Sequence, residues 1–205
     1  LLGFELWRRR VAGGQWEIAN PLWWQYEVHA DKHDLVFNNG VMTLATDGGL
    51  YQSYDDAANW IDIERIPTTQ FYRVGYNPHR TDWYYGGAQD NGTTGGPDIN
   101  TDWLRIYSGD GFQTLFHPEN PDYFYAEIQS GGIVVTDNGG LDWYDATDGI
   151  NGNDRRNWDM PVIMSAHDPN VLYTGTYRVY KSTAGLFPDW MAISKDLTDV
   201  FILHR

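Results

Sequence analysis

The stretch 28–34 holds the densest group of side chains that could bind a metal ion or a ligand. His29, Asp31 and His33 alternate with other residues there. In a strand, alternation would put all three on one face, where two imidazoles and one carboxylate suit zinc or iron. The same groups could instead hold the start of a strand in place through hydrogen bonds to neighbouring loops. The sequence therefore predicts either a metal or ligand site or a structural cluster at these residues.

Two aspartates in turn sequences are the candidate catalytic residues. Asp90 is followed by Asn-Gly, Asp110 is followed by Gly, and a Gly-rich loop over 93–98 lies between them. If the two turns lie at the same end of a sheet structure, their carboxylates could face each other. Glycoside hydrolysis needs such a pair at about 5 Å or roughly 6.5–9.5 Å. Turn formation is the competing explanation, because Asp-Asn-Gly and Asp-Gly both favour turns.

Four further residues are candidates for ligand contact. Gln89 and Asn91 flank Asp90, and these oxygen-rich loops could bind calcium or another divalent metal, although no twelve-residue calcium loop is present. Trp23 and Trp24 follow an Asn-Pro pair and could offer flat rings to a sugar. Core packing between structural repeats would explain the same two tryptophans.

Composition predicts an all-β protein. The 205 residues include 10 Trp, 14 Tyr and 22 Gly, which favour strands and the turns between them. A net charge of −14 argues against nucleic acid as a partner, and the lack of cysteine excludes disulfides and thiolate metal sites. No apolar run is long enough to be a transmembrane segment. Because the chain starts at Leu1 and ends within an apolar stretch, 200–205, we expect it to be a piece of a longer protein.

The tryptophans repeat along the chain. Trp16, Trp60, Trp103, Trp143 and Trp190 follow one another at spacings of 44, 43, 40 and 47 residues. Such a period is typical of four-stranded propeller blades. A second marker, an X-Pro pair before an aromatic stretch, recurs at residues 77–78, 117–118 and 168–169. We therefore predict that residues 1–205 form one partial β-propeller of four to five blades, ending near these five tryptophans.

Alternation and turn residues place the predicted strands. In four successive blades they are 34–37, 41–46, 49–53 and 60–63; 71–76, 83–88 and 103–107; 113–117, 123–127, 132–136 and a last strand at 143; and 162–166, 172–176, 179–182 and 190–193.

Two turns resemble the Asp-box pattern Ser-x-Asp-x-Gly-x-Thr-Trp. The first runs from Ser53 through Asp55 to Trp60, with alanine in the glycine place. The second runs from Thr136 to Trp143, and we interpret Asp137 as its acid and Gly139 as its glycine, with one extra residue before the tryptophan. In such a turn the Asp accepts backbone N–H groups, the Gly adopts a conformation that other residues resist, and the Trp covers the turn. The six residues assigned to this structural role are Ser53, Asp55, Trp60, Asp137, Gly139 and Trp143.

The chain resembles the Asp-box, or BNR-repeat, β-propellers, which include exported bacterial proteins similar to glycoside hydrolases and the sortilin ectodomain. Besides the two turns, the likeness lies in residues 28–34, 46–53, 86–93 and 108–112. The resemblance implies a propeller of seven or more blades and a secreted, periplasmic or cell-surface location. It also implies catalytic sets, an arginine triad with a Tyr–Glu pair in sialidases and two Asp from two propellers in xyloglucanases. Neither set can be placed on this sequence.

Two functions follow from this resemblance. The chain could be a rigid binding or structural module for a protein or glycan partner, or for a larger assembly. The alternative is a carbohydrate-active enzyme, a glycoside hydrolase whose cleft is completed by further blades or by a second propeller. Since no catalytic set can be assigned, the sequence favours the binding module.

Overall fold

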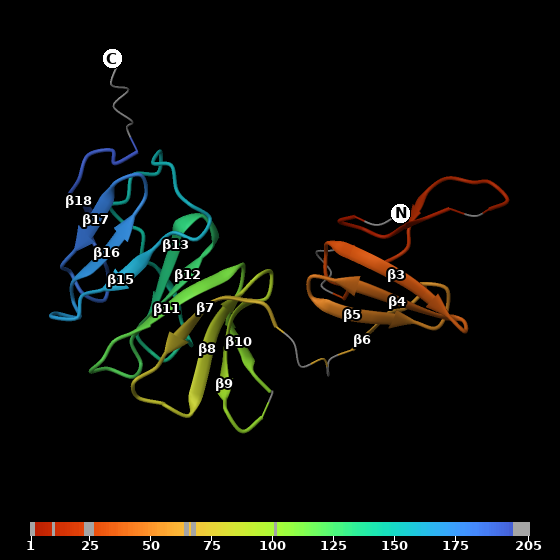
Figure 1. The fold of residues 1–205 in the computed structure, drawn as a ribbon, viewed down its shortest axis with the longest axis horizontal. Coiled ribbons are helices and arrows are strands. Elements are labelled where there is room, and N and C mark those ends of the chain that lie inside the picture. Colours follow the sequence, from red (N-terminus) through yellow and green to blue (C-terminus); the bar gives the residue numbers. More distant parts are fainter. Residues whose placement is uncertain are drawn as a thin grey trace, which may run out of the picture. The chain divides into compact units, whose positions relative to one another are not determined.

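The computed structural model describes residues 3–9, 11–22, 27–63, 66, 69–100 and 102–198. The chain divides into two compact units, Leu1–Thr68 and Thr69–Arg205, which we call unit 1 and unit 2. The described residues form four four-stranded antiparallel sheets and one two-stranded sheet, with a single 3₁₀ turn (Figure 1). Among the described residues, we find no helix whose length and apolarity would allow it to cross a membrane.

Unit 1 contains the two-stranded sheet and one blade. β1 (Trp7–Arg8) pairs with β2 (Glu17–Ile18), and the blade runs in chain order through β3 (Lys32–Asn38), β4 (Val41–Thr46), β5 (Gly49–Ser53) and β6 (Ile61–Asp62). An Asn-Gly turn joins β3 to β4, with positive φ at both Asn39 and Gly40, which matches the twist of a tight hairpin. Alternation along β4 buries Leu44 against Val28 and Tyr51.

Unit 2 contains three blades. The first is β7 (Phe71–Tyr76), β8 (Trp83–Ala88), β9 (Gly92–Pro97) and β10 (Leu104–Tyr107). The second is β11 (Gly111–Phe116), β12 (Phe124–Ile128), β13 (Gly132–Thr136) and β14 (Tyr144–Asp145), with the 3₁₀ turn η2 (Gln129–Gly131) between β12 and β13. The third is β15 (Val162–Met164), β16 (Leu172–Gly175), β17 (Val179–Ser182) and β18 (Met191–Ala192). Each blade is an up-and-down meander in which neighbouring strands in the chain pair.

Adjacent blades of unit 2 meet through their first strands. β7 contacts β11, and β11 contacts β15. The largest apolar core of this unit lies between the second and third blades and buries Tyr125, Ile133, Met160, Leu172 and Trp190. Between the first and second blades the approach is closer, because a Cβ added to Gly87 would lie 2.2 Å from backbone atoms of the Gly111–Phe112 peptide. Backbone therefore packs on backbone at that point.

The prediction of an all-β fold built from four-stranded blades is confirmed, with one correction. The three X-Pro pairs lie between the first and second strands of the unit 2 blades, as the repeat implies. The Gly-rich segment expected to be a loop is instead strand β9. Its glycines make room for aromatic rings, since a Cβ on Gly95 would lie 2.6 Å from the Tyr85 ring and one on Gly96 2.3 Å from the Trp103 ring. Glycine in this strand marks close packing and not a break in the sheet.

Candidate functional site

The turn between β5 and β6 has the hydrogen bonds predicted for an Asp-box turn. The Ser53 hydroxyl accepts the Ala57 N–H at 2.9 Å. The two carboxylate oxygens of Asp55 accept the backbone N–H of Asn59 at 2.9 Å and its side-chain amide at 2.7 Å. These bonds, the one from the Asn59 side chain first, lower the pKa of Asp55. Ala57 has φ of 66°, the left-handed conformation that the glycine place of the pattern requires.

The turn between β13 and β14 corrects the sequence interpretation. Thr136 Oγ1 accepts the Gly140 N–H, and Asn138 Oδ1 accepts the Asp142 N–H, both at 2.9 Å. Asn138 therefore fills the Asp place and Gly140 the Gly place, with no extra residue before the tryptophan. The assignments of Asp137 as the acid and Gly139 as the glycine were wrong by one position.

Amide and carboxylate exchange places between the two turns. In the β5–β6 turn, the Asn59 amide donates to the Asp55 carboxylate at 2.7 Å. In the β13–β14 turn, Asn138 Nδ2 donates to the Asp142 carboxylate at 2.8 Å. Each turn therefore holds one amide and one carboxylate four residues apart, which avoids placing two carboxylates in contact.

Two of the repeating tryptophans, Trp60 and Trp190, link successive elements through their indole N–H groups. Trp190 donates to the carbonyl of Ala146 at 2.7 Å, and Trp60 donates to the carbonyl of Ala19 at 3.2 Å. Each acceptor lies three residues after the preceding blade-ending tryptophan, Trp143 or Trp16. These contacts give Trp60 and Trp190 a structural role.

The His29–His33 stretch differs from its predicted geometry. β3 begins only at Lys32 and Asp31 has φ of 56°, so strand alternation does not put His29, Asp31 and His33 on one face. His33 bonds the Asp47 carboxylate in the β4–β5 turn, which raises the pKa of His33. His29 Nδ1 lies 3.1 Å from the carbonyl of Ala30. A metal or ligand role for these residues stays a prediction.

A buried lysine that the sequence analysis missed lies inside this stretch. Lys32 is 6% exposed, and its ammonium donates to the carbonyls of Phe4 and His29 at 2.9 and 2.8 Å. Glu5 lies 3.8 Å away. Burial lowers the pKa of Lys32, while the Glu5 carboxylate opposes that change. These bonds tie the start of β3 to the segment before β1. Trp23 and Trp24 lie outside the described residues.

Asp90 and Asp110 come together through a turn. The Asp110 carboxylate is buried and accepts the Asp90 backbone N–H at 2.7 Å, and the Asp110 N–H donates to Gln129 Oε1 at 2.9 Å. Asp90 has φ of 57° in the β8–β9 turn, where Asn91 donates from its side chain to the carbonyl of Gln89 at 2.9 Å. The β8–β9 turn, the start of β11 and the β12–β13 turn are therefore joined at one end of unit 2.

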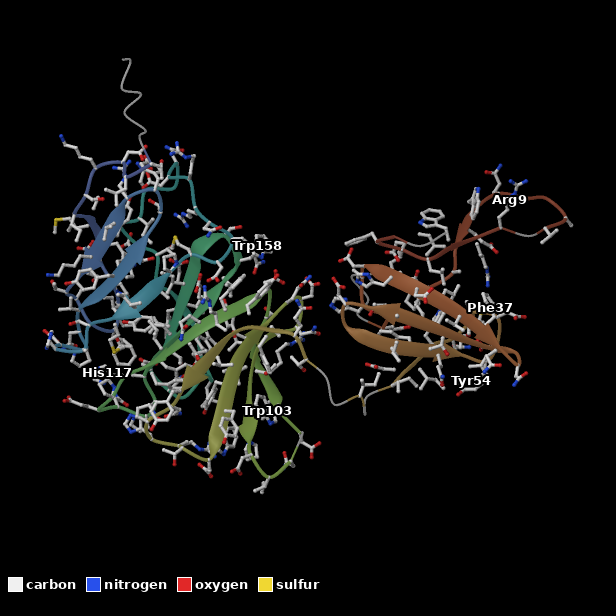
Figure 2. All side chains as sticks on the ribbon, viewed as in Figure 1. Arg9, Phe37, Tyr54, Trp103, His117 and Trp158 are labelled. Atoms are coloured by element: carbon white, nitrogen blue, oxygen red, sulfur yellow. The ribbon has the colours of Figure 1, made fainter. Side chains whose placement is uncertain are left out.

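Near this end lies a group of residues that the sequence analysis did not single out. Arg73, on β7, donates from Nε and Nη2 to Asp159 Oδ2 at 3.0 and 2.5 Å. Their side chains are 53% and 27% exposed. The neighbouring Trp158 is 50% exposed and lies at the surface of unit 2, where its carbonyl accepts the Ser130 N–H of the β12–β13 turn at 2.9 Å (Figure 2).

Three aromatic rings form a row beneath this surface. Tyr72 stacks on Phe112 with ring centres 4.7 Å apart, and Phe112 meets Trp158 edge-on at 6.5 Å. The rings come from β7, β11 and the segment before β15, so Trp158 is supported by two first strands. The residues of this region, the Arg73 cluster, are Tyr72, Arg73, Phe112, Glu127, Trp158 and Asp159.

Glu127 is the buried acid of the Arg73 cluster. It lies on β12 and is 1% exposed. Oε2 accepts a long hydrogen bond of 3.5 Å from the Gln113 N–H, whereas Oε1 has no hydrogen-bond partner among the described residues. Burial, followed by the negative charge of Asp159, raises the pKa of Glu127 to about 8. Glu127 therefore carries its proton at neutral pH.

Strand register shows that Glu127 departs from the repeat. The second and third strands of each four-stranded blade close on a turn, and the second-strand residue just before the closing pair is Ala45, Gly87, Glu127 or Thr174. Three of the four are small. The sequence signal was present, because Glu127 is the one charged residue in the strand-like run 123–128.

An aromatic groove of about 500 Å³ lies on another part of unit 2. It covers a face of the first blade, and its lining residues include no aspartate, glutamate, lysine, arginine or histidine. Its lining consists of Phe71, Val74, Gly75, Tyr76, Thr81, Trp83, Tyr84, Tyr85 and Trp103. The groove offers mainly apolar area, and the hydroxyls of Tyr76, Tyr84 and Tyr85 are its titratable groups.

Comparison with known proteins shows the fold. No family model matches the chain, and no curated protein matches it. An ancestral GH74 enzyme superposes with a TM-score of 0.53 at 20% identity, covering 80% of this chain and 24% of that one. A GH74 xyloglucanase from Xanthomonas campestris gives 0.47 at 13%, covering 90% and 32%, and YCF48 bound to D1 peptide gives 0.48 at 15%, covering 92% and 60%.

The chain is a partial β-propeller, as predicted, and its described residues form four four-stranded blades and one two-stranded sheet. It spans about a quarter of the ancestral GH74 enzyme that it resembles. Because propellers of one architecture serve many functions, these likenesses leave the activity to be argued from the site.

Proposed function

We propose that the chain is a binding module of an extracellular, periplasmic or cell-surface β-propeller, and that the Arg73 cluster binds a neutral glycan. The observation that supports this most is the half-exposed indole of Trp158 beside the Arg73–Asp159 pair. An indole face stacks on the C–H face of a sugar ring. A guanidinium donates and a carboxylate accepts, so the pair can bind neighbouring hydroxyls.

The cluster is arranged for binding before a ligand arrives. Asp159 fixes the Arg73 guanidinium through two N–H groups, and Phe112 supports Trp158 edge-on. Fixed side chains lose less conformational freedom on binding, which favours affinity. The net charge of −14 disfavours polyanionic glycans, so the proposed ligand is an uncharged polysaccharide.

The hydrogen bonds of Asp110 support a binding module over the catalytic pair considered first. Its buried carboxylate accepts the Asp90 N–H at 2.7 Å and so stabilises the junction between two turns. A glycoside hydrolase remains the second candidate, favoured by one observation. Glu127, which keeps a proton at neutral pH, lies near the Asp159 carboxylate, and hydrolysis of a glycosidic bond uses an acid and a carboxylate.

Affinity electrophoresis of the full chain through gels that contain neutral polysaccharides, xyloglucan among them, tests the proposal. Trp158→Ala should weaken retardation at least about tenfold in apparent Kd, equivalent to about 1.4 kcal/mol, because the stacking face is lost. Trp16→Ala is the matched control, since Trp16 is 52% exposed and lies outside the cluster. It should change the apparent Kd less than about twofold.

Each other outcome assigns a different function. Retardation that Trp158→Ala leaves unchanged, or no retardation by any polysaccharide, would overturn the glycan proposal. Release of new reducing ends that both Glu127→Gln and Asp159→Asn abolish would support the hydrolase instead.

A further inference from the structure

Glu127 fills a space that the repeat elsewhere closes with small residues. At the corresponding position of the preceding blade, Gly87 packs directly on the Gly111–Phe112 backbone. At that of the following blade, Thr174 is buried and its hydroxyl donates to the carbonyl of Pro161 at 2.9 Å. Glu127 is larger than either, is equally buried, and has one oxygen without a partner. This position therefore costs stability that a small residue would not cost.

Two carboxyl groups share one cation at this place. The charged groups that act on Glu127 are Asp159, from the segment before β15, and Arg73, from β7. The backbone N–H groups of Gln113, on β11, and of Met160 lower the pKa of Glu127 without offsetting its burial. Arg73 is already bound to Asp159 through two N–H groups. The Glu127 carboxyl is buried, whereas Arg73 is half exposed and already bound to Asp159, so Arg73 does not offset the cost of a buried carboxylate and Glu127 is more stable there while it holds its proton.

We infer that Glu127 is a proton-linked positioning residue for the Arg73 cluster. With its proton in place it leaves Arg73 bound to Asp159, which holds Trp158 and Asp159 as described. Without its proton, its carboxylate competes with Asp159 for Arg73 and loosens the segment that carries Trp158. The consequence for glycan affinity rests on the proposed function, whereas the consequence for stability does not.

The direction of the pH effect follows from the raised pKa. The unfolded chain releases the Glu127 proton near the ordinary value of 4.5, but the folded chain holds it up to about pH 8. Stability from this residue is therefore complete below about pH 4.5 and declines as pH rises to about 8. The difference corresponds to a change in the unfolding equilibrium constant on the order of a thousandfold.

Urea unfolding of the full chain between pH 4.5 and 9 tests the inference. Wild type should lose stability across this range, and Glu127→Gln should remove most of that loss and be at least as stable as wild type at pH 8.5. Glu119→Gln is the control, because Glu119 is an exposed glutamate of the same unit and should leave the profile unchanged. A profile that is the same in wild type and Glu127→Gln would overturn the inference.

Asp159→Asn gives an independent reading that does not depend on Glu127→Gln folding. It removes the competing carboxylate and leaves Arg73 to Glu127, so the fall in stability should move to lower pH by at least about one unit. An unmoved profile would contradict the shared-cation argument.

The pH dependence of glycan affinity provides a third test. If the Arg73 cluster binds glycan, affinity should fall at least about threefold between pH 6 and 9 in wild type and not in Glu127→Gln. If Glu127→Gln removes the pH-dependent loss of stability but no glycan binds, the proposed function is wrong and the inference about the Glu127 proton still holds.

Discussion

The β5–β6 and β13–β14 turns differ from the Arg73 cluster in how their polar side chains are hydrogen-bonded. In the β5–β6 and β13–β14 turns, side chains at the same spacing accept the same backbone N–H groups. In the Arg73 cluster, Glu127 stands where the other blades have Ala45, Gly87 and Thr174, and its Oε1 lacks a partner among the described residues. Residues that recur at equivalent positions of the blades form the fold. Residues that differ at such a position, as Glu127 does, are the candidates for a function specific to this propeller.

The tightness of the blade contact at Gly87 provides the strongest test of this contrast. Gly87→Ala should destabilise the chain by about 3 kcal/mol, because its Cβ would lie 2.2 Å from the backbone of the Gly111–Phe112 peptide and strand β11 would have to move. Urea unfolding measures the effect. Gly152→Ala is the matched control, since an added Cβ there meets nothing within 4 Å, and it should stay within about 0.5 kcal/mol of wild type. Equal effects of the two variants would show that the contact at Gly87 is not close.

The same contrast explains which features could be predicted from the sequence. Periodic Trp and X-Pro markers predicted the blades, because one local pattern recurs with each structural unit. The β9 strand was missed, since its glycines serve the rings of Tyr85 and Trp103, which are contacts that turn statistics do not include. The His29–His33 geometry was wrong, because the left-handed conformation of Asp31 delays the start of β3.

The Arg73 cluster could not be assembled from the sequence alone. Arg73 and Asp159 are 86 residues apart in the chain and meet only because the first strands of three successive blades lie side by side, which places β7 near the segment before β15. Glu127 carried a local signal, a lone charge in an aromatic strand, but its significance depends on the residues at the same register in other blades. Register depends on which residues pair between strands, and this pairing cannot be read directly from the sequence.

The amide and the carboxylate occupy exchanged positions in the two turns, and altering this arrangement should change stability less than Gly87→Ala does. Asn138→Asp would put a second carboxylate against Asp142, in place of the 2.8 Å hydrogen bond. We expect a loss of about 1 kcal/mol in urea unfolding at pH 7, reduced by high salt, because both groups are near the surface.

The double variant provides the control for this exchange. Adding Asp142→Asn to Asn138→Asp recreates the arrangement of Asp55 and Asn59, so stability should return to within about 0.5 kcal/mol of wild type. A double variant as unstable as the single one would mean that the two turns are not equivalent.

Acid should affect the hydrogen bonds of the two turns differently, and this is the smallest of the three effects that we expect from this comparison. The Asn59 N–H donates to a carboxylate, that of Asp55, whose pKa is lowered by these bonds, whereas the Asp142 N–H donates to the Asn138 amide oxygen, which does not titrate. A lowered pKa stabilises the folded turn above the ordinary value near 3.8, and this contribution is lost as pH falls through the lowered one. Hydrogen exchange, corrected for intrinsic rates, should therefore show protection of the Asn59 N–H falling between pH 4 and 2 while that of Asp142 N–H persists. Asp55→Asn should abolish the pH dependence at Asn59, since its acceptor oxygen would then be an amide as in the second turn. Parallel loss at both sites would indicate that acid acts on the whole chain, and the exchange of groups would then be without consequence for stability.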